Sequence, residues 1–253
     1  MIKLGEGSFG TVYRSGRCAI KVPREDFPPY LSRVLYLLCE DIARHCVLES
    51  GELRMPIWGP TVWDVYADGP IPPVVADELK RCLCDQLGTC QSRGLIHCDV
   101  KGANIALTGA WPTAMPECLL EACEKQLLGS HLRRAHAAGG IGYGFVLIDL
   151  DAICPLNQIA ECDRGTLCPY GELLQHLVKT PHLAAYAMWF AAAAVVAAFT
   201  PAKQIRCRSE FASQHEQLAH TGMLLSLDGT LAALDSVAFF ETMAAALTLQ
   251  YSR

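Results

Sequence analysis

The segment HCDVKGAN at residues 97–104 limits the fold and the chemistry of this chain more than any other stretch. Asp99 stands two residues after His97, Lys101 follows two residues later, and Asn104 ends the segment. A carboxylate can orient a hydroxyl nucleophile, an ammonium group can contact a phosphate, and an amide oxygen can bind magnesium. These three groups on one short loop predict phosphoryl transfer.

The composition favours a globular protein that works inside a cell. Of the 253 residues 51% are hydrophobic, which predicts a sizeable buried core. The net charge of −5 and the lack of a long basic run argue against nucleic acid as the main partner. The 13 cysteines are odd in number and scattered, and no signal peptide precedes them. We therefore expect free thiols in a reducing compartment, the cytoplasm or the nucleus.

One apolar segment invites comparison with a membrane span. Residues 183–199 carry no charge, but they are rich in alanine rather than leucine and have no basic cluster on either flank. We therefore predict a buried helix inside a globular structure, and no membrane contact.

The N-terminal residues predict β-structure around a glycine-rich loop. We expect strands near residues 2–4, 11–14 and 18–22, with a tight turn at Ser15-Gly16. Apolar residues at helical spacing then predict a helix over residues 30–47.

Two further strands are predicted over residues 53–58 and 61–66. The stretch 67–73 is rich in Asp, Gly and Pro, and so predicts a linker. This linker separates a β-rich part, residues 1–66, from residues 74–253.

The part after the linker is predicted to be mostly helical. Apolar residues repeat with a helical period over residues 75–90, and Gly94 follows as a stop signal. Short strands are expected at residues 95–96 and 105–107, and helices dominate from Tyr170 onward.

The glycine-rich loop GEGSFGTV at residues 5–12 opens a strand rather than a helix, and its hairpin partner ends with Ala19-Ile20-Lys21. In a dinucleotide-binding fold such a loop would follow a strand and begin a helix. The context instead predicts a glycine flap whose backbone amides cover nucleotide phosphates. Lys21 would then bridge the α- and β-phosphates.

A buried lysine needs a carboxylate to hold its charge. Glu40, on the predicted helix, is the first candidate partner of Lys21, although it lies away from the apolar stripe of that helix. Glu49 is the competing candidate.

Asp149 follows a predicted buried strand, residues 145–148, which would deliver its carboxylate to the floor of a cleft. Magnesium prefers hard oxygen ligands, and Asp149 with Asn104 would supply them. Asp151, two residues on, is the alternative in register. Residues 109–144, before this strand, are interpreted as an insertion on the surface.

In this order, the pieces resemble the eukaryotic-type protein kinase family. Residues 5–12 match its glycine loop, Ala19-Ile20-Lys21 its lysine motif, residues 97–104 its catalytic loop and Asp149-Leu150-Asp151 its D-F-G position. The resemblance runs over residues 2–151, and the motifs are highly specific as a set.

The resemblance implies a single catalytic domain over residues 1–253. Its fold would be α+β and two-lobed, with a small β-rich N-lobe, a hinge at residues 67–73 and a shortened, mostly helical C-lobe. ATP and Mg²⁺ would bind between the lobes, and the γ-phosphate would pass to serine or threonine hydroxyls of protein substrates. Lys101 favours these hydroxyls over tyrosine.

The same resemblance assigns the site residues. Asp99 would be the catalytic base, Lys101 the contact to the γ-phosphate and Lys21 the third catalytic residue, while Asn104 and Asp149 would hold the metal. The implied nucleotide-binding residues, the last two beside the adenine, are Gly5, Glu6, Gly7, Ser8, Phe9, Gly10, Val12, Ala19, Lys21, Glu40, Tyr66 and Asp68.

Some residues depart from the family pattern. Cys98 replaces an arginine that often couples the catalytic loop to activation-loop phosphorylation, so regulation by that route is not expected. Leu150-Asp151 replaces Phe-Gly, and the glycine hinge is therefore missing. No clear A-P-E motif is present, and Ala187 lies near the place of the aspartate that braces the catalytic loop. The chain also resembles the protein kinases of large DNA viruses, in particular those of herpesviruses. This second resemblance rests on the way in which the chain departs from the family pattern, and not on a matching motif.

Three functions remain open from the sequence. The first is an active serine/threonine protein kinase. The second is a pseudokinase that scaffolds partners, which the missing glycine favours and the retained lysine, aspartates and asparagine oppose. The third is a small-molecule phosphotransferase of related fold, such as a sugar or aminoglycoside kinase, which residues 148–151 resemble.

Overall fold

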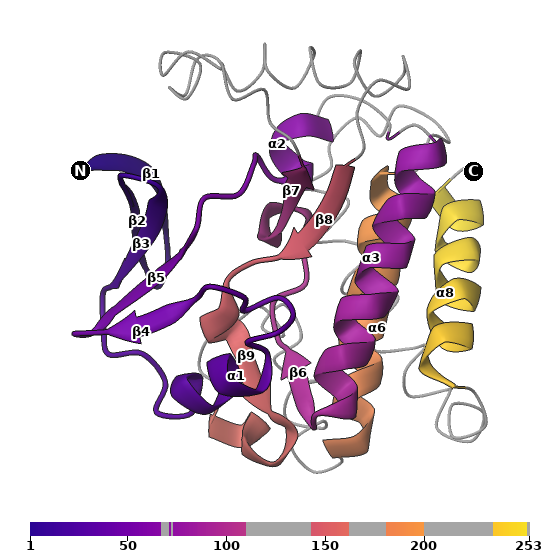
Figure 1. The fold of residues 1–253 in the computed structure, drawn as a ribbon. Helices are drawn as coiled ribbons and strands as arrows, with labels where there is room; N and C mark the ends of the chain where they lie inside the picture. The colour runs from indigo at the N-terminus through magenta and orange to yellow at the C-terminus, as the bar shows by residue number, and fades with distance from the viewer. Residues whose placement is uncertain (67–70, 72, 110–142, 162–180, 200–234, 252–253) are drawn as a thin grey trace.

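The chain forms a mixed α+β structure with a small antiparallel sheet and a few helices (Figure 1). This computed structural model describes residues 1–66, 71, 73–109, 143–161, 181–199 and 235–251. Almost all of the expected insertion at residues 109–144 lies outside the described residues.

A five-stranded antiparallel sheet forms the N-terminal part, in the strand order β1-β2-β3-β5-β4. Its strands are β1 (Ile2–Gly7), β2 (Gly10–Ser15), β3 (Cys18–Pro23), β4 (Val47–Glu49) and β5 (Glu52–Pro56). The predicted strands at residues 2–4, 11–14, 18–22 and 53–58 are confirmed. So is the turn between β2 and β3, where Gly16 adopts a φ of 60° in the left-handed region that glycine tolerates best.

Helix α1 (Leu31–Leu37) is much shorter than the predicted helix over residues 30–47. Beyond it the chain continues in turns, although apolar residues of this stretch stay buried. The guanidinium of Arg93 donates a hydrogen bond to the carbonyl of Leu37 and lies 2.7 Å from the carboxylate of Asp41. A side chain from a distant turn therefore provides the last carbonyl of the helix with a hydrogen-bond donor.

The strand predicted over residues 61–66 is wrong, because this segment forms helix α2 (Val62–Tyr66). The hydroxyl of Thr61 accepts a hydrogen bond from the backbone N–H of Asp64 at 3.1 Å. In return, Oδ2 of Asp64 accepts one from the backbone N–H of Thr61 at 3.0 Å. This reciprocal cap favours the start of a helix over an extended strand.

The chain leaves the sheet through residues 57–60. Of the predicted linker at residues 67–73, residues 67–70 and 72 lie outside the described residues. The N–H of Gly59 donates to the carbonyl of Leu107 at 2.9 Å, and the N–H of Leu107 donates to the carbonyl of Pro60 at 3.0 Å. The connection out of the sheet is therefore already fastened to the second part of the molecule.

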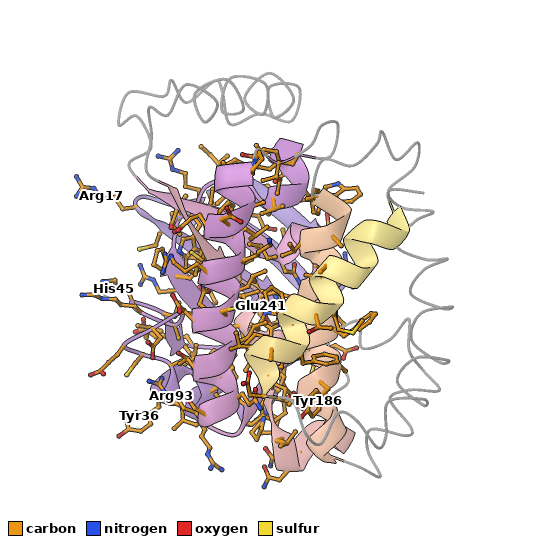
Figure 2. The ribbon with its side chains drawn as sticks, turned by 90° about the vertical axis from the view of Figure 1, so that its right-hand side faces the viewer. Arg17, Tyr36, His45, Arg93, Tyr186 and Glu241 are labelled. Atoms are coloured by element: carbon orange, nitrogen blue, oxygen red, sulfur yellow. The ribbon has the colours of Figure 1, made fainter. Side chains whose placement is uncertain are left out.

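Among the described residues, the second part consists largely of three helices: α3 (Pro73–Ser92), α6 (Pro181–Phe199) and α8 (Ser236–Tyr251). Helix α6 packs against both α3 and α8, as Figures 1 and 2 show. Gln91 of α3 accepts a hydrogen bond from the indole of Trp189 at 2.6 Å and one from the hydroxyl of Ser236 at 2.9 Å. One side chain thus joins all three helices.

Helix α6 is apolar over its whole length, and the side chains described for it are mostly buried. The prediction of a buried helix at residues 183–199 is confirmed. None of the helices among the described residues is long and apolar enough to cross a membrane.

Two antiparallel strand pairs complete the second part: β6 (Leu95–His97) with β9 (Ile153–Pro155), and β7 (Ile105–Gly109) with β8 (Tyr143–Leu147). The predicted strands at residues 95–96, 105–107 and 145–148 are confirmed. Three 3₁₀ turns lie beside them: η1 (Gly102–Asn104), η3 (Leu150–Ala152) and η4 (Leu156–Glu161).

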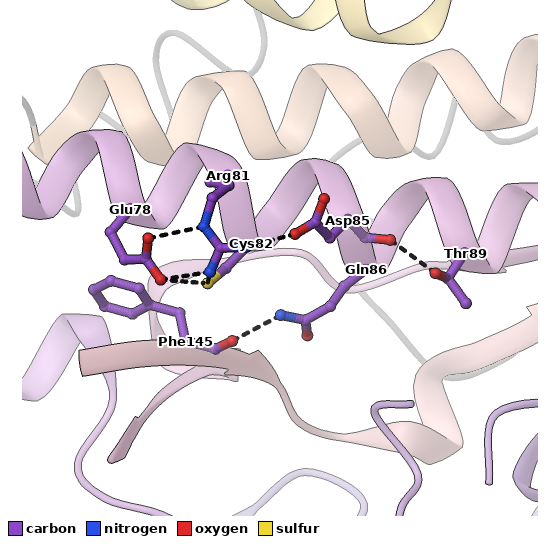
Figure 3. A network of polar contacts seen from close by, with 7 residues as sticks. All are labelled: Glu78, Arg81, Cys82, Asp85, Gln86, Thr89 and Phe145. Atoms are coloured by element: carbon purple, nitrogen blue, oxygen red, sulfur yellow. Dashed lines mark hydrogen bonds and ion pairs between the residues drawn. The ribbon is translucent and has the colours of Figure 1, made fainter. Parts of the chain in front are cut away.

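Helix α3 holds strand β8 through one side chain (Figure 3). The amide of Gln86 donates to the carbonyl of Phe145 at 2.7 Å and accepts from the N–H of Leu147 at 2.8 Å. These two bonds fix the strand immediately before Asp149. Figure 3 also shows Arg81, which is exposed and pairs with carboxylates of its own helix.

Candidate functional site

A cavity of about 810 Å³ lies between the sheet and the turns of the second part. The β1–β2 hairpin, β3, the connection at residues 57–60 and the segments that follow β6 and β8 contribute to its lining. Most of the predicted site residues meet here: Gly5, Glu6, Gly7, Ser8, Phe9, Gly10, Val12, Ala19, Lys21, Asp99, Lys101, Asn104 and Asp149.

The glycine hairpin forms one wall of the cavity. Gly7 pairs with Gly10 across the hairpin, and Ser8 and Phe9 form its turn. A Cβ atom on Gly10 would lie 2.6 Å from the carbonyl oxygen of Val22, so only glycine lets strand β3 approach this closely. A Cβ atom on Gly7 would meet open space instead. The hairpin therefore needs its last glycine for packing.

Lys21 projects from the middle of β3 and is buried. Its ammonium group forms ion pairs with Asp149 and with Asp151, the latter at 2.6 Å. Burial alone would lower the pKa of Lys21, but the charges and hydrogen bonds of the two carboxylates raise it above its ordinary value. Lys21 is therefore held as a cation.

Two carboxylates facing one ammonium group leave this cluster with an excess negative charge. Burial raises the pKa of Asp149, the negative charge of Asp151 adds to this, and the positive charge of Lys21 opposes it. A bound cation would relieve the repulsion between the two carboxylates.

The predicted partners of Lys21 are not the observed ones. Glu40 lies beyond the end of α1, exposed to solvent, and Glu49 on β4 is exposed and lies 3.8 Å from Arg54. Because α1 ends at Leu37, no helical face carries Glu40 toward the sheet. The additional partner is Asp151, which the sequence suggested only as a substitute for Asp149.

Asp99 stands at the centre of a second polar cluster. Its carboxylate accepts a hydrogen bond from the side-chain amide of Asn104 at 2.7 Å and pairs with the ammonium group of Lys101 at 2.8 Å. The same amide nitrogen of Asn104 donates to the backbone carbonyl of Asp99 at 2.9 Å. Neither of these bonds uses the amide oxygen of Asn104. The three predicted residues of this loop are therefore brought together.

His97 ties this loop to the end of β8. Its Nε2 lies 2.9 Å from the carbonyl of Ile148, and its Nδ1 accepts the backbone N–H of Asp99 at 3.2 Å. A carbonyl oxygen can only accept, so Nε2 carries the hydrogen and the ring is the neutral tautomer. The N–H of Ile148 in turn donates to the carbonyl of Asn104 at 2.9 Å.

The chain reverses direction at Asp149, which has φ 64° and ψ 52° in the left-handed region. Aspartate and asparagine tolerate this region better than most residues other than glycine. The 3₁₀ turn η3 follows, closed by the N–H of Ala152 donating to the carbonyl of Asp149 at 2.9 Å. This turn brings Asp149 and Asp151 to the same lysine.

Tyr66 does not line the cavity, because it is fully buried in the core on α2. Asp68 lies outside the described residues. The lining residues that precede Tyr66 most closely in the sequence include Pro56, residues 57–60 and Trp63. Gly59-Pro60, a dipeptide typical of turns, lies in this connection.

Cys98, beside Asp99, is buried, and its Sγ lies 3.4 Å from Sγ of Cys154. It acts here as a small core residue that packs β6 against β9. The position where the kinase pattern expects an arginine therefore has no surface role in this structure.

Comparisons with known proteins gave no match, either to a protein-family model or among curated proteins. The function of the chain is therefore inferred from the side chains and the backbone that surround the cavity.

Proposed function

We propose that this chain is an ATP-dependent serine/threonine protein kinase. One observation carries the proposal: the glycine hairpin, Lys21, Asp99, Lys101 and Asp149, which lie far apart in the sequence, line one cavity. Its volume of about 810 Å³ suits a nucleotide, since small-molecule sites span roughly 300–1,000 Å³.

In this proposal the molecule has the two-lobed arrangement of a protein kinase. The five-stranded sheet with α1 is the N-lobe, residues 57–60 are the hinge, and α3, α6 and α8 belong to the C-lobe. The adenine would lie against the hinge and the apolar side chains of Val12, Ala19 and Met55, all of which line the cavity.

The phosphates would lie under the glycine hairpin. Backbone N–H groups of its turn would cover them, and the ammonium group of Lys21 would contact the α- and β-phosphates. Since Lys21 is held as a cation inside the protein, its attraction for phosphate is screened less than that of a surface lysine.

Asp99 would accept the proton of the substrate hydroxyl. As the hydroxyl oxygen bonds to the γ-phosphorus, the bond from that phosphorus to its bridging oxygen breaks and ADP leaves. The bonds from Asn104 and Lys101 orient the carboxylate for this step. The side chain of Lys101 is 47% exposed, which lets its ammonium group move from Asp99 to the γ-phosphate.

The oxygen donors at the cavity fit magnesium. The side chain of Asp149 is 21% exposed, and the amide oxygen of Asn104 is not used in the two bonds to Asp99. The excess negative charge beside Lys21 also favours a divalent cation. Magnesium, when bound, would offset the charge of the transferring phosphoryl group.

The loop at residues 97–104 needs no contact with a phosphorylated residue to keep its position. His97, Asn104 and the end of β8 already fix the position of Asp99 through hydrogen bonds. The buried Cys98 offers no positive charge for a phosphate. We therefore propose that the kinase is constitutively active.

The test is the transfer of labelled γ-phosphate from ATP to a generic basic protein in the presence of magnesium. Asp99→Asn and Lys21→Met should each lower kcat by about 10²- to 10⁴-fold, the usual contribution of such groups. Glu49→Gln, at an exposed position away from the cavity, is the matched control and should retain wild-type activity.

Three results would contradict the proposal in different ways. Equal transfer by the wild type and both variants would exclude these residues from catalysis. Binding of ATP without transfer would indicate a scaffold, and transfer to sugars or aminoglycosides alone would indicate a small-molecule kinase.

A further inference from the structure

We propose that Asp151 is the positioning residue that holds Lys21 in its working orientation, in place of a carboxylate from helix α1. The catalytic part of this inference rests on the proposed kinase function. The ion pair itself does not, and it can be tested without any activity.

The two aspartates that contact Lys21 both line the cavity, but they differ in their exposure to solvent. The side chain of Asp149 is 21% exposed, whereas that of Asp151 is 1% exposed. A metal–phosphate complex in the cavity can therefore reach the carboxylate of Asp149. The carboxylate of Asp151, which is almost fully shielded from solvent, lies 2.6 Å from the ammonium group.

This difference assigns a separate role to each carboxylate. If Asp149 binds a metal, its oxygens are shared between the metal and Lys21, and its hold on the lysine weakens. The pair between Lys21 and Asp151 does not compete with the metal. Asp151 therefore keeps the ammonium group in place when the site is filled.

The backbone around Asp151 is suited to a fixed position. Its neighbours Leu150 and Ala152 are both buried, each only 1% exposed. The N–H of Ala152 closes the turn on Asp149, and the carbonyl of Ala152 accepts the N–H of Cys98 at 2.9 Å. The turn that presents Asp151 is thus bonded directly to the loop that carries Asp99.

Helix α1 offers no comparable carboxylate among the described residues. Its residues Leu31–Leu37 include no Asp or Glu, and Glu40 lies beyond its end, exposed. The orientation of Lys21 consequently depends on the carboxylates of the turn at residues 149–151 and not on a carboxylate of α1.

The first experiment measures labelling of Lys21 by an amine-reactive reagent in the ligand-free protein, by mass spectrometry of the peptides. Asp151→Asn keeps the shape of the side chain but weakens the ion pair, so labelling of Lys21 should rise several-fold. Glu40→Gln should leave it unchanged. Labelling of the exposed Lys3 is the internal reference and should be equal in all proteins.

The second experiment compares catalysis and nucleotide binding. Asp151→Asn should lower kcat by about 10- to 100-fold, as expected for a misplaced catalytic group. Its affinity for ATP should still increase on addition of magnesium, as in the wild type. Asp149→Asn should lose that increase, Asp151→Glu should recover part of kcat, and Glu40→Gln should match the wild type.

These outcomes separate the inference from the proposed function. A wild-type protein without transferase activity would overturn the kinase proposal, while the labelling of Lys21 would still decide the role of Asp151. Unchanged labelling in Asp151→Asn, or a loss of activity in Glu40→Gln, would overturn the inference. Loss of the magnesium effect in Asp151→Asn would make Asp151 a metal ligand instead.

Discussion

The two walls of the cavity are built in different ways. Among the described residues, the sheet contributes one buried charged side chain, Lys21, to the cavity lining, whereas the opposite wall contributes the buried polar residues Asp99, Asn104 and Asp151. The opposite wall is connected internally by hydrogen bonds between its loop, β8 and η3. The sheet wall reaches these turns through the ion pairs of Lys21. We therefore expect this opposite wall, called the acidic wall below, to be preformed, because its own hydrogen bonds connect its parts.

The largest effect on the contact between the two walls is expected from Lys21→Met. Methionine keeps much of the apolar stem but removes the cation that faces the buried Asp151 and the partly buried Asp149, and breaking a buried ion pair costs about 3–5 kcal/mol. We expect a loss of this size in the free energy of unfolding at neutral pH, measured by urea denaturation. Lys3→Met, whose ion pair with Glu6 is on the surface, should cost much less.

The same variant should respond to pH. Burial already raises the pKa of Asp149, and loss of the positive charge of Lys21 would raise it further. The folded variant would then bind a proton more tightly than the unfolded chain, so its stability should increase as the pH falls from neutral to mildly acidic values. If the loss of stability relative to the wild type were equal at neutral and at mildly acidic pH, the contact of Lys21 with Asp149 would not be its cause.

Gln86→Leu tests whether the acidic wall owes its preformed shape to α3. The variant would leave the carbonyl of Phe145 and the N–H of Leu147 without partners in a buried place, which costs about 3 kcal/mol for the two groups. Calorimetric unfolding measures the loss. Thr89→Ala, which removes an exposed bond one turn later on the same helix, is the control and should change stability little.

Gly10→Ala tests how the sheet wall is packed. Its Cβ atom would come within 2.6 Å of the backbone oxygen of Val22, and overpacking of this kind costs about 2 kcal/mol. Gly7→Ala, across the hairpin and facing open space, should leave the unfolding midpoint nearly unchanged. Equal effects of the two substitutions would show that β3 does not need the close approach.

Arg81→Ala should have the smallest effect, because Arg81 is exposed on α3 and does not line the cavity. Figure 3 shows it beside carboxylates of its own helix. Its pairs with Glu78 and Asp85 are exposed and screened by salt. We expect a slight decrease in the unfolding midpoint at low salt and none at high salt. A large decrease would show that the surface of α3 supports the acidic wall.

The sequence predicted the parts of the site that depend on local signals. The glycine-rich loop and the turn at Ser15-Gly16 specify a hairpin because few other residues suit such turns. The loop at residues 97–104 places its polar residues within reach of one another by spacing alone. Their positions could therefore be predicted without knowledge of distant contacts.

The parts that failed depend on contacts between distant residues. The spacing of the apolar residues after Leu37 matches a helix, but the chain buries these side chains in a series of turns. Arg93, far along the chain, bonds to the last carbonyl of the helix and to Asp41. The pairing of Lys21 with Asp151 joins strand β3 to a turn far along the chain. The wrong prediction of a strand at residues 61–66 has a different cause. The reciprocal cap of Thr61 and Asp64, which starts α2, is a local signal that could have been recognised in the sequence.

The composition of helix α6 also matters for folding while the chain is being synthesised. It is apolar over its whole length, and α8, which covers part of it, comes later in the chain. On a ribosome, where domains fold as they emerge, that face stays open to water until α8 has been synthesised. A chain released before residue 236 should therefore bind a hydrophobic dye and aggregate. Equal solubility of such a fragment and the full chain would show that α8 is not needed as a cover.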